Sequence, residues 1–197
     1  MGKIRNRLIN IVVLHIITIQ QQMSMKLQDF ICFLNSNQMI NIHNLLKDDE
    51  NGIINRLKLQ KYVFLAQTSL QNDFGYEYDI YRNGPYSSDL ANYCYDGLDV
   101  DRMSSDIKDK SWADNSLFTD RFLSLFKAKE PEWLEVAATL VDSTNYCENE
   151  QESLNKVYAI KSMFSRDYID NIWNELKDKS LLHYESDLKT KNFLSIF

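Results

Sequence analysis

The chain has 197 residues, of which 44% are hydrophobic and 25% are charged, a composition typical of a globular domain. Its length fits one domain with a substantial core. The net charge of −6 makes the molecule as a whole repel polyanions, so nucleic-acid binding would require a segregated basic face. With only 5 Gly and 2 Pro to interrupt them, helices are expected to dominate.

The first 24 residues stand apart from the rest. Three basic residues precede an apolar run from Leu8 to Ile19, as in a signal peptide, but no small-residue cleavage site follows. The run is also too short to span a bilayer as a helix. We therefore expect residues 1–24 to be an extension, either a helix packed on the body or residues ahead of a start at Met23 or Met25. Residues 25–197 are expected to form a single domain without a membrane segment.

The first half of this domain reads as helices. Leu27, Phe30, Ile31 and Leu34 repeat at helical spacing, and a short helix is expected near 39–46. The acidic and Asn-Gly residues at 48–52 are expected to break the chain before a central helix, 53–70. Its buried stripe comprises Leu59, Val63, Ala66 and Leu70, widened by Ile53, Ile54, Tyr62 and Leu65. Gly75 is placed to end this helix.

Residues 76–82 alternate in the manner of a half-buried strand. Asn83-Gly84 is a hairpin-type turn, yet Pro85 has no N–H to donate, so the chain is not expected to return as a central strand. Ser87 is a fitting N-cap, with Asp89 in the first turn of a helix that runs to about Tyr95. Residues 96–110 are expected to be a polar loop.

The second half is also helical. A helix is expected over 117–126, and Pro131 is expected at the first position of the next. After a polar loop, 146–153, two helices follow, and Ser165 caps the second. The segment 180–186, SLLHYES, can form a strand, which would give a winged-helix-like ending. The fold class expected is mainly α (α+β), a single helical domain with a small antiparallel sheet.

Four segments occur in an order that resembles a known family. KLQKYVFLAQ (58–67) is followed by YRNGPYSSDL (81–90), WLEVAATLVDS (133–143) and KSMFSRDYIDNIWNELKDKSLL (161–182). Between about Met25 and Leu182 the chain is similar to the YwgA-like proteins, relatives of the Panacea (SocA-like) antitoxin domains. Residues 1–24 lie outside the pattern.

The resemblance implies a small helical domain with a minor sheet, prokaryotic and cytoplasmic. Panacea-like members are thought to act as antitoxins or phage-linked adaptors, so the implied partner is another protein, for example a toxin. YwgA-like members supply no settled activity, and the resemblance brings no catalytic residues with it.

The candidate binding surface combines the basic side of the central helix with the turn at 82–87. Helix N-terminal N–H groups and Arg82 could hold an anion or contact a partner, although turn chemistry alone also explains Gly84, Pro85 and Ser87. The basic helix residues fit a solvated face, an acidic partner peptide, or a buried Lys58 paired with a carboxylate. The predicted partner-binding residues are Arg56, Lys58, Gln60, Lys61, Arg82, Asn83, Gly84, Pro85, Tyr86 and Ser87.

Other chemistry has weaker support. Cys32, Cys94 and Cys147 are odd in number and lack C-x-x-C spacing, and the three histidines are scattered, so we expect no disulfide framework, metal site or cofactor. An enzyme would need Cys94 to pair with His43 or His183 through the fold. The last helix is net acidic, which disfavours a recognition helix on DNA. We therefore expect a non-enzymatic protein-interaction module, with a winged-helix DNA-binding regulator as the alternative.

Overall fold

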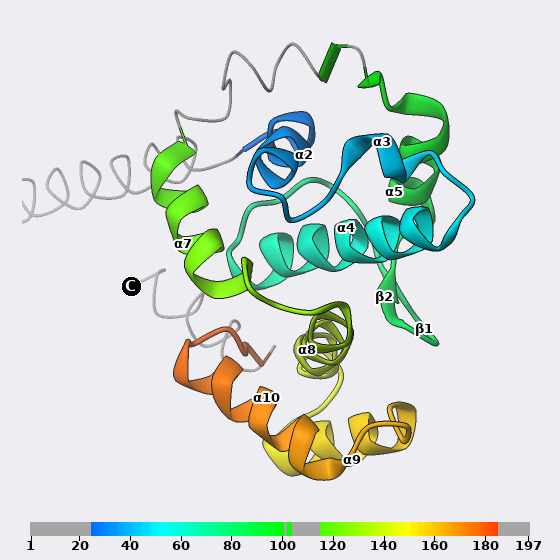
Figure 1. Ribbon diagram of the computed structural model, residues 1–197. Coiled ribbons are helices and arrows are strands. Elements are labelled where there is room, and N and C mark those ends of the chain that lie inside the picture. The colour runs from blue at the N-terminus through cyan, green and yellow to red at the C-terminus, as the bar shows by residue number, and fades with distance from the viewer. Residues whose placement is uncertain (1–24, 101, 104–114, 185–197) are drawn as a thin grey trace, which may run out of the picture.

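The computed structural model describes residues 25–100, 102–103 and 115–184, and these form a mainly helical fold with a two-stranded antiparallel sheet, as predicted (Figure 1). The predicted extension 1–24 and most of the predicted loop 96–110 lie outside these ranges. The α-helices are α2 (Leu27–Ser36), α3 (Ile42–Leu45), α4 (Glu50–Ser69), α5 (Ser88–Asn92), α7 (Ser116–Phe126), α8 (Pro131–Ser143), α9 (Glu150–Ile160) and α10 (Arg166–Asp178).

Helix α4 is the centre of the fold. In Figure 1 it crosses the middle of the molecule, with α2 and α3 on one side and α8 on the other, while α9 and α10 pack against the far side of α8. The predicted widened stripe is buried in the second half of α4, where Tyr62, Val63 and Leu65 are inaccessible to solvent. The prediction is wrong for the first half, because Ile53 and Ile54 are exposed.

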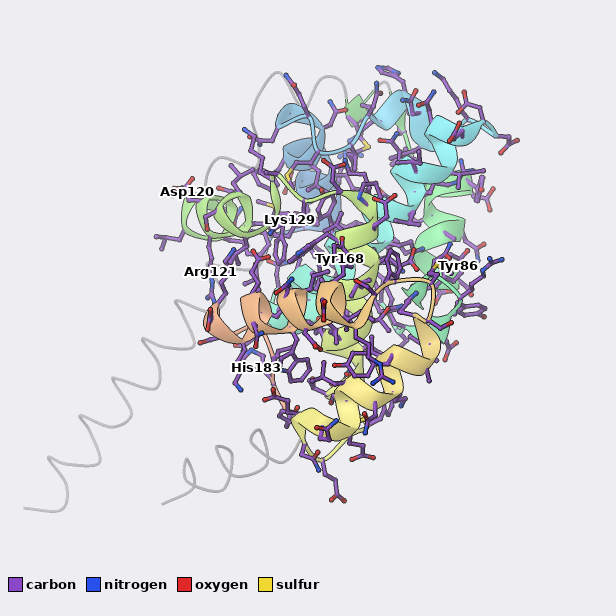
Figure 2. All side chains as sticks on the ribbon, turned by 60° about the horizontal axis from the view of Figure 1, so that its bottom comes forward. Tyr86, Asp120, Arg121, Lys129, Tyr168 and His183 are labelled. Atoms are coloured by element: carbon purple, nitrogen blue, oxygen red, sulfur yellow. The ribbon has the colours of Figure 1, made fainter. Side chains whose placement is uncertain are left out.

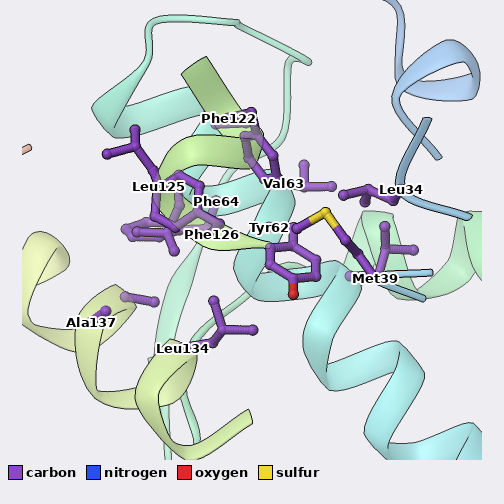
Figure 3. Packing of buried hydrophobic residues seen from close by; sticks show 14 of the residues in the cluster. Leu34, Met39, Tyr62, Val63, Phe64, Phe122, Leu125, Phe126, Leu134 and Ala137 are labelled. Carbon is purple, nitrogen blue, oxygen red and sulfur yellow. The ribbon is translucent and has the colours of Figure 1, made fainter. Parts of the chain in front are cut away.

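Aromatic side chains fill the space between α2, α4 and α7. The ring of Phe122 lies 5.0 Å from Phe30, 5.7 Å from Tyr62 and 4.8 Å from Phe126, measured between centroids. Figure 3 shows this packing continuing to Leu134 on α8. Aromatic pairs at these distances add to the free energy gained by area burial, so this cluster fixes how α4 and α7 sit against each other.

The strand and turn differ from the prediction. Only Asp79–Tyr81 is a strand (β1), and its three residues are exposed rather than half-buried. After the turn, Gly84–Tyr86 returns as a second strand (β2) with Ile80 opposite Pro85. The return is allowed because in a two-stranded ribbon each strand is an edge, where the missing N–H of Pro85 interrupts no central ladder.

Two expected helix breaks fall elsewhere. Helix α4 already begins at Glu50, because Asp49 is its N-cap and accepts a hydrogen bond from the N–H of Gly52. Gly52 lies in the first turn, where a Cβ would come within 1.9 Å of the Lys47 carbonyl oxygen. At the other end α4 stops at Ser69, so Gly75, at φ 78°, shapes the following loop instead.

The remaining helices follow the predicted signals more closely. Pro131 is at the start of α8, and Ser87 and Ser165 accept the N-cap bonds of α5 and α10. Helix α5 gives way after Asn92 to a π-helical turn, Tyr93–Gly97. The predicted loop at 146–153 is shorter, because Asn149 caps α9 at Glu150.

The C-terminal segment has no wing within the described residues. Positions 181–184 are not a strand, and the rest of SLLHYES lies beyond residue 184, the last one described. Among the described residues, no helix has the length and apolar character needed to cross a membrane.

Candidate functional site

A pocket of about 510 Å³ opens between the N-terminal half of α4, the β1–β2 hairpin and the segment that joins α5 to the π-helical turn. Its lining combines apolar walls with a few polar and basic groups, a mixture typical of binding sites. The lining residues are Ile53, Arg56, Leu57, Gln60, Lys61, Tyr81, Arg82, Asn83, Gly84, Tyr86, Ala91, Cys94 and Tyr95.

Most of the predicted partner-binding residues meet at this pocket. Those that line it are Arg56, Gln60, Lys61, Arg82, Asn83, Gly84 and Tyr86. Pro85, within β2, and Ser87, directly after it, are buried and are not among the lining residues. Lys58 does not line this pocket. It lines a different pocket beside α3, together with His43. Burial lowers the pKa of Lys58, while Glu130 acts in the opposite direction.

Lys61 is the basic group beneath the hairpin. Its side chain is 2% exposed, and Nζ donates a 2.6 Å hydrogen bond to the carbonyl of Pro85. Burial is the main cause that lowers the pKa of Lys61 to about 7, and repulsion from Lys161 lowers it further. The negative charges of Glu135 and Asp142 act in the opposite direction and raise the pKa. Lys61 is therefore not part of the solvated basic face that the sequence suggested.

A second buried lysine holds the other end of the turn. The Nζ of Lys161, just after α9, donates to the carbonyl of Arg82 at 2.7 Å and pairs with Glu135 of α8 at 2.7 Å. This role could not be predicted from the sequence, since a lone lysine after a helix is usually solvated. Together the two lysines fix the hairpin at Arg82 and Pro85 from two separate elements.

Gln60 attaches the hairpin to α4 at a third point. Its side-chain amide donates to the Ser87 carbonyl at 2.8 Å and accepts from the Ser87 N–H at 2.9 Å. Both backbone groups are buried, so each would otherwise lose its hydrogen bond to water without replacement. These two hydrogen bonds orient Ser87 as the N-cap of α5. Ala91 of α5, with Cys94 and Tyr95 of the π-helical turn, then forms one wall of the pocket.

Gly84 allows the hairpin to lie against α8. Its φ is 85°, a left-handed conformation that favours glycine. A Cβ at this position would lie 2.5 Å from Thr139 Oγ1 and 3.3 Å from the Glu135 carbonyl oxygen. Gly84 therefore has two roles: it adopts the positive φ that follows the turn, and its lack of a Cβ lets the hairpin backbone lie close to α8.

Tyrosines form the rim of the pocket. Tyr81 and Tyr86 contact each other edge to face at 5.3 Å and are 54% and 37% exposed. Across the opening Tyr95 is 52% exposed, and the guanidinium of Arg56 lies 5.2 Å from its ring. Sequence reasoning missed Tyr81, Tyr95 and the wall residue Ile53. The clustering of tyrosines around Asn83-Gly84-Pro85 was the available signal.

Cys94 lies in the pocket wall and is 3% exposed. Burial raises the pKa of its thiol to about 11, although Arg56 acts to lower it. A thiol in this state is a poor nucleophile at neutral pH. In the part of the chain that the structure describes, no three His, Cys, Asp or Glu side chains are grouped to hold a metal ion.

Comparison with known proteins finds no matching family model, no matching curated protein and no matching solved structure.

Proposed function

We propose that this chain is a non-enzymatic protein-interaction module that binds a partner protein at the tyrosine-rimmed pocket. The observation that carries the proposal is the combination of exposed Tyr81, Tyr86 and Tyr95 with Arg56 and Arg82 around one hollow. Tyrosine and arginine are the residues most enriched at the energetic centres of protein interfaces.

The support behind the rim favours binding. Lys61, Lys161 and Gln60 fix the hairpin backbone from α4 and from the chain after α9. Binding groups that are already held in place lose little conformational entropy on association. The hairpin therefore offers Tyr81 and Tyr86 on a supported backbone.

The resemblance to YwgA-like and Panacea-like proteins suggests the context. We propose an antitoxin-like or defence- or phage-linked regulator in a prokaryotic cytoplasm, with a toxin as one candidate partner. The resemblance depends on the order of the four segments around KLQK, GPYS and the final helix.

The charged side chains of α10 favour this proposal over DNA binding. Of its two basic residues, Arg166 lies over the ring of Tyr158 and Lys177 pairs with Glu150 at 2.7 Å. The adjacent Lys179 pairs with Glu175 at 2.8 Å. Cations already paired with carboxylates, on a helix rich in acids, contribute little attraction to phosphates. A DNA-binding regulator would show gel shifts with random duplex DNA that weaken steeply as salt rises; we expect no shift.

The direct test is partner capture from a prokaryotic lysate followed by reconstitution. The tagged full chain is used as bait, captured proteins are identified by mass spectrometry, and each candidate is purified for titration calorimetry. We expect one partner to bind in purified form, and Tyr86→Ala and Arg82→Ala each to weaken it about tenfold or more.

Arg121→Ala is the matched control, because Arg121 is exposed and lies across the molecule from Tyr86 in Figure 2. Circular dichroism confirms that each variant folds. A purified partner that binds both pocket variants as tightly as the unchanged chain would reject this surface.

A further inference from the structure

We propose that the pocket recognises an acidic peptide segment of its partner, in which an Asp or Glu side chain meets Arg56 and Arg82 and an adjacent apolar side chain contacts the tyrosines. This inference rests on the proposed function and specifies the chemistry of the partner.

The charge of the pocket is opposite to that of the molecule. The lining carries the guanidinium charges of Arg56 and Arg82, with Lys61 buried beneath the hairpin, and it contains no acidic residue, although the chain carries a net charge of −6. Arg82 is exposed and forms no ion pair with any residue that the structure describes. A local positive region on an acidic protein attracts a carboxylate and disfavours other sites for it.

Arg56 is already oriented for such a contact. One guanidinium nitrogen, Nη1, donates to the carbonyls of Leu45 and Lys47 at 2.8 and 2.6 Å, and the group lies over Tyr95. Its second nitrogen, Nη2, is 4.0 Å from the carboxylate of Asp48, whose side chain is 92% exposed. The Arg56 side chain is 16% exposed, but the pair is long and its carboxylate lies in solvent, so the pair is weak and an incoming carboxylate can replace Asp48 at little cost.

The size and walls of the pocket favour a short segment over a folded surface. A volume of about 510 Å³ holds a few side chains. Ile53, Tyr81 and Tyr95 supply the apolar part of its walls and rim and are exposed in the unbound chain. An acid next to an aromatic or aliphatic residue satisfies both the charge and the apolar surface.

The experiment uses fluorescein-labelled hexapeptides that place Asp or Glu beside Phe, Tyr or Leu between Gly and Ser residues. Each acidic peptide has a twin with Asn or Gln, and binding to the full chain is followed by fluorescence polarisation. We expect at least one acidic peptide to bind about tenfold more tightly than its twin. Arg82→Gln should remove most of that preference, and Arg121→Gln, the same charge change on the opposite side, should leave it unchanged.

Three results with the peptides alone would overturn the inference: no acidic peptide binds, acid and amide twins bind equally, or Arg121→Gln weakens binding as much as Arg82→Gln. Benzoate serves as a free carboxylic acid, and if it competes as well as the best peptide at equal concentration, the peptide assignment is rejected. A purified partner that loses affinity with Tyr86→Ala but not with Arg82→Gln would refute the acidic segment while leaving the proposed function standing.

Discussion

Burial, a hydrogen bond and neighbouring charges all act on the side chain of Lys61. It is buried, donates to the Pro85 carbonyl, and lies close enough to Lys161 for repulsion to add to the effect of burial. The nearby acids Glu135 and Asp142, both on α8, offset part of this. Asp142 is itself affected, since burial raises its pKa to about 6 while Lys156 and Lys61 act to lower it.

The lowered pKa of Lys61 predicts a specific pH dependence of stability. Its pKa falls from 10.5 to about 7 on folding, so above pH 7 the unfolded chain binds more protons than the folded chain, and the free energy of unfolding rises with pH. Between pH 7 and 8.5 this rise should be on the order of 1 kcal/mol. Lys61→Met should lack this contribution, so the free energy of unfolding of the original chain should rise relative to that of Lys61→Met between the two pH values, as measured by urea denaturation.

The comparison between the two proteins removes contributions from shared groups that do not interact with Lys61. Asp142 does interact with it: without Lys61 the pKa of Asp142 rises further, so the free energy of unfolding of Lys61→Met falls with pH and the difference between the proteins grows in the expected direction. At pH 8.5 the unfolded cysteines are about half ionised, a contribution that both proteins share, and unfolded tyrosines remain largely protonated. Parallel pH dependences in the original chain and in Lys61→Met would show that Lys61 titrates normally in the fold.

Gly84 provides a second test at the level of one residue. Gly84→Ala combines a positive φ with a contact of 2.5 Å to Thr139 Oγ1, whereas Gly75→Ala, at φ 78°, meets nothing within 4 Å. Gly75→Ala should cost about 1 kcal/mol of unfolding free energy from backbone strain. Gly84→Ala should cost roughly 1–3 kcal/mol more, since a steric clash is added to the strain.

The clash can be separated from the strain by a double variant. Thr139→Ala removes the hydroxyl oxygen that the new Cβ would meet, so it should recover part of the stability lost in Gly84→Ala. Equal unfolding free energies for Gly84→Ala and Gly75→Ala, measured by urea denaturation, would contradict the close approach.

At the scale of elements, where each helix begins and ends depends on its capping residues as much as on its buried face. Asp49, Ser87 and Ser165 supply N-caps, and Asn149 does the same for α9. Several helix C-termini pass instead through a residue with positive φ that is not glycine, including Gln38, Gln71 and Ser180. Such residues retain steric strain that glycine would relieve.

Ser180→Gly should therefore stabilise the protein. Ser180 follows α10 at φ 54° and is exposed, and the next N–H, of Leu181, closes the helix on the Leu176 carbonyl at 2.9 Å. We expect a gain of about 0.5–1 kcal/mol in unfolding free energy, or a rise of a few degrees in Tm. The control is Ser124→Gly, an exposed position inside α7, where the same change should destabilise by a similar amount. If Ser180→Gly lowered the free energy of unfolding as much as Ser124→Gly does, Ser180 would carry no backbone strain.

At the scale of the whole molecule, the three thiols report on the integrity of the core. Cys32, Cys94 and Cys147 are all buried, in α2, in the pocket wall and after α8. A chromogenic disulfide reagent at pH 7.5 should label them slowly in the native chain and rapidly in 6 M guanidinium chloride, because burial blocks access and raises the pKa of Cys94. Rapid native labelling of Cys94, located by peptide mapping, would instead reveal an activated thiolate and favour the enzyme class.

Local signals made much of the fold predictable. The periods in α2 and α7, Pro131, and the caps at Ser87 and Ser165 depend on neighbouring residues, so the sequence contains the information. The start of α4 was misplaced because Asn51-Gly52 looks like a break, whereas Gly52, which has no Cβ, leaves room for the Lys47 carbonyl against the first turn of the helix.

The sequence by itself determined the helical class, a tight turn just before Pro85 and the helix that Ser87 caps, since each follows from interactions within a few residues. The turn residues are Arg82 and Asn83, one position earlier than predicted, because Gly84 already pairs with Tyr81 in β2. Only the tertiary structure decided that Lys61 is buried, that Lys161 reaches the carbonyl of Arg82, 79 residues earlier in the chain, and that three tyrosines meet around one pocket. The physical reason is that burial and charge pairing depend on which distant segments come together, and for α4 that is set by its packing against α8.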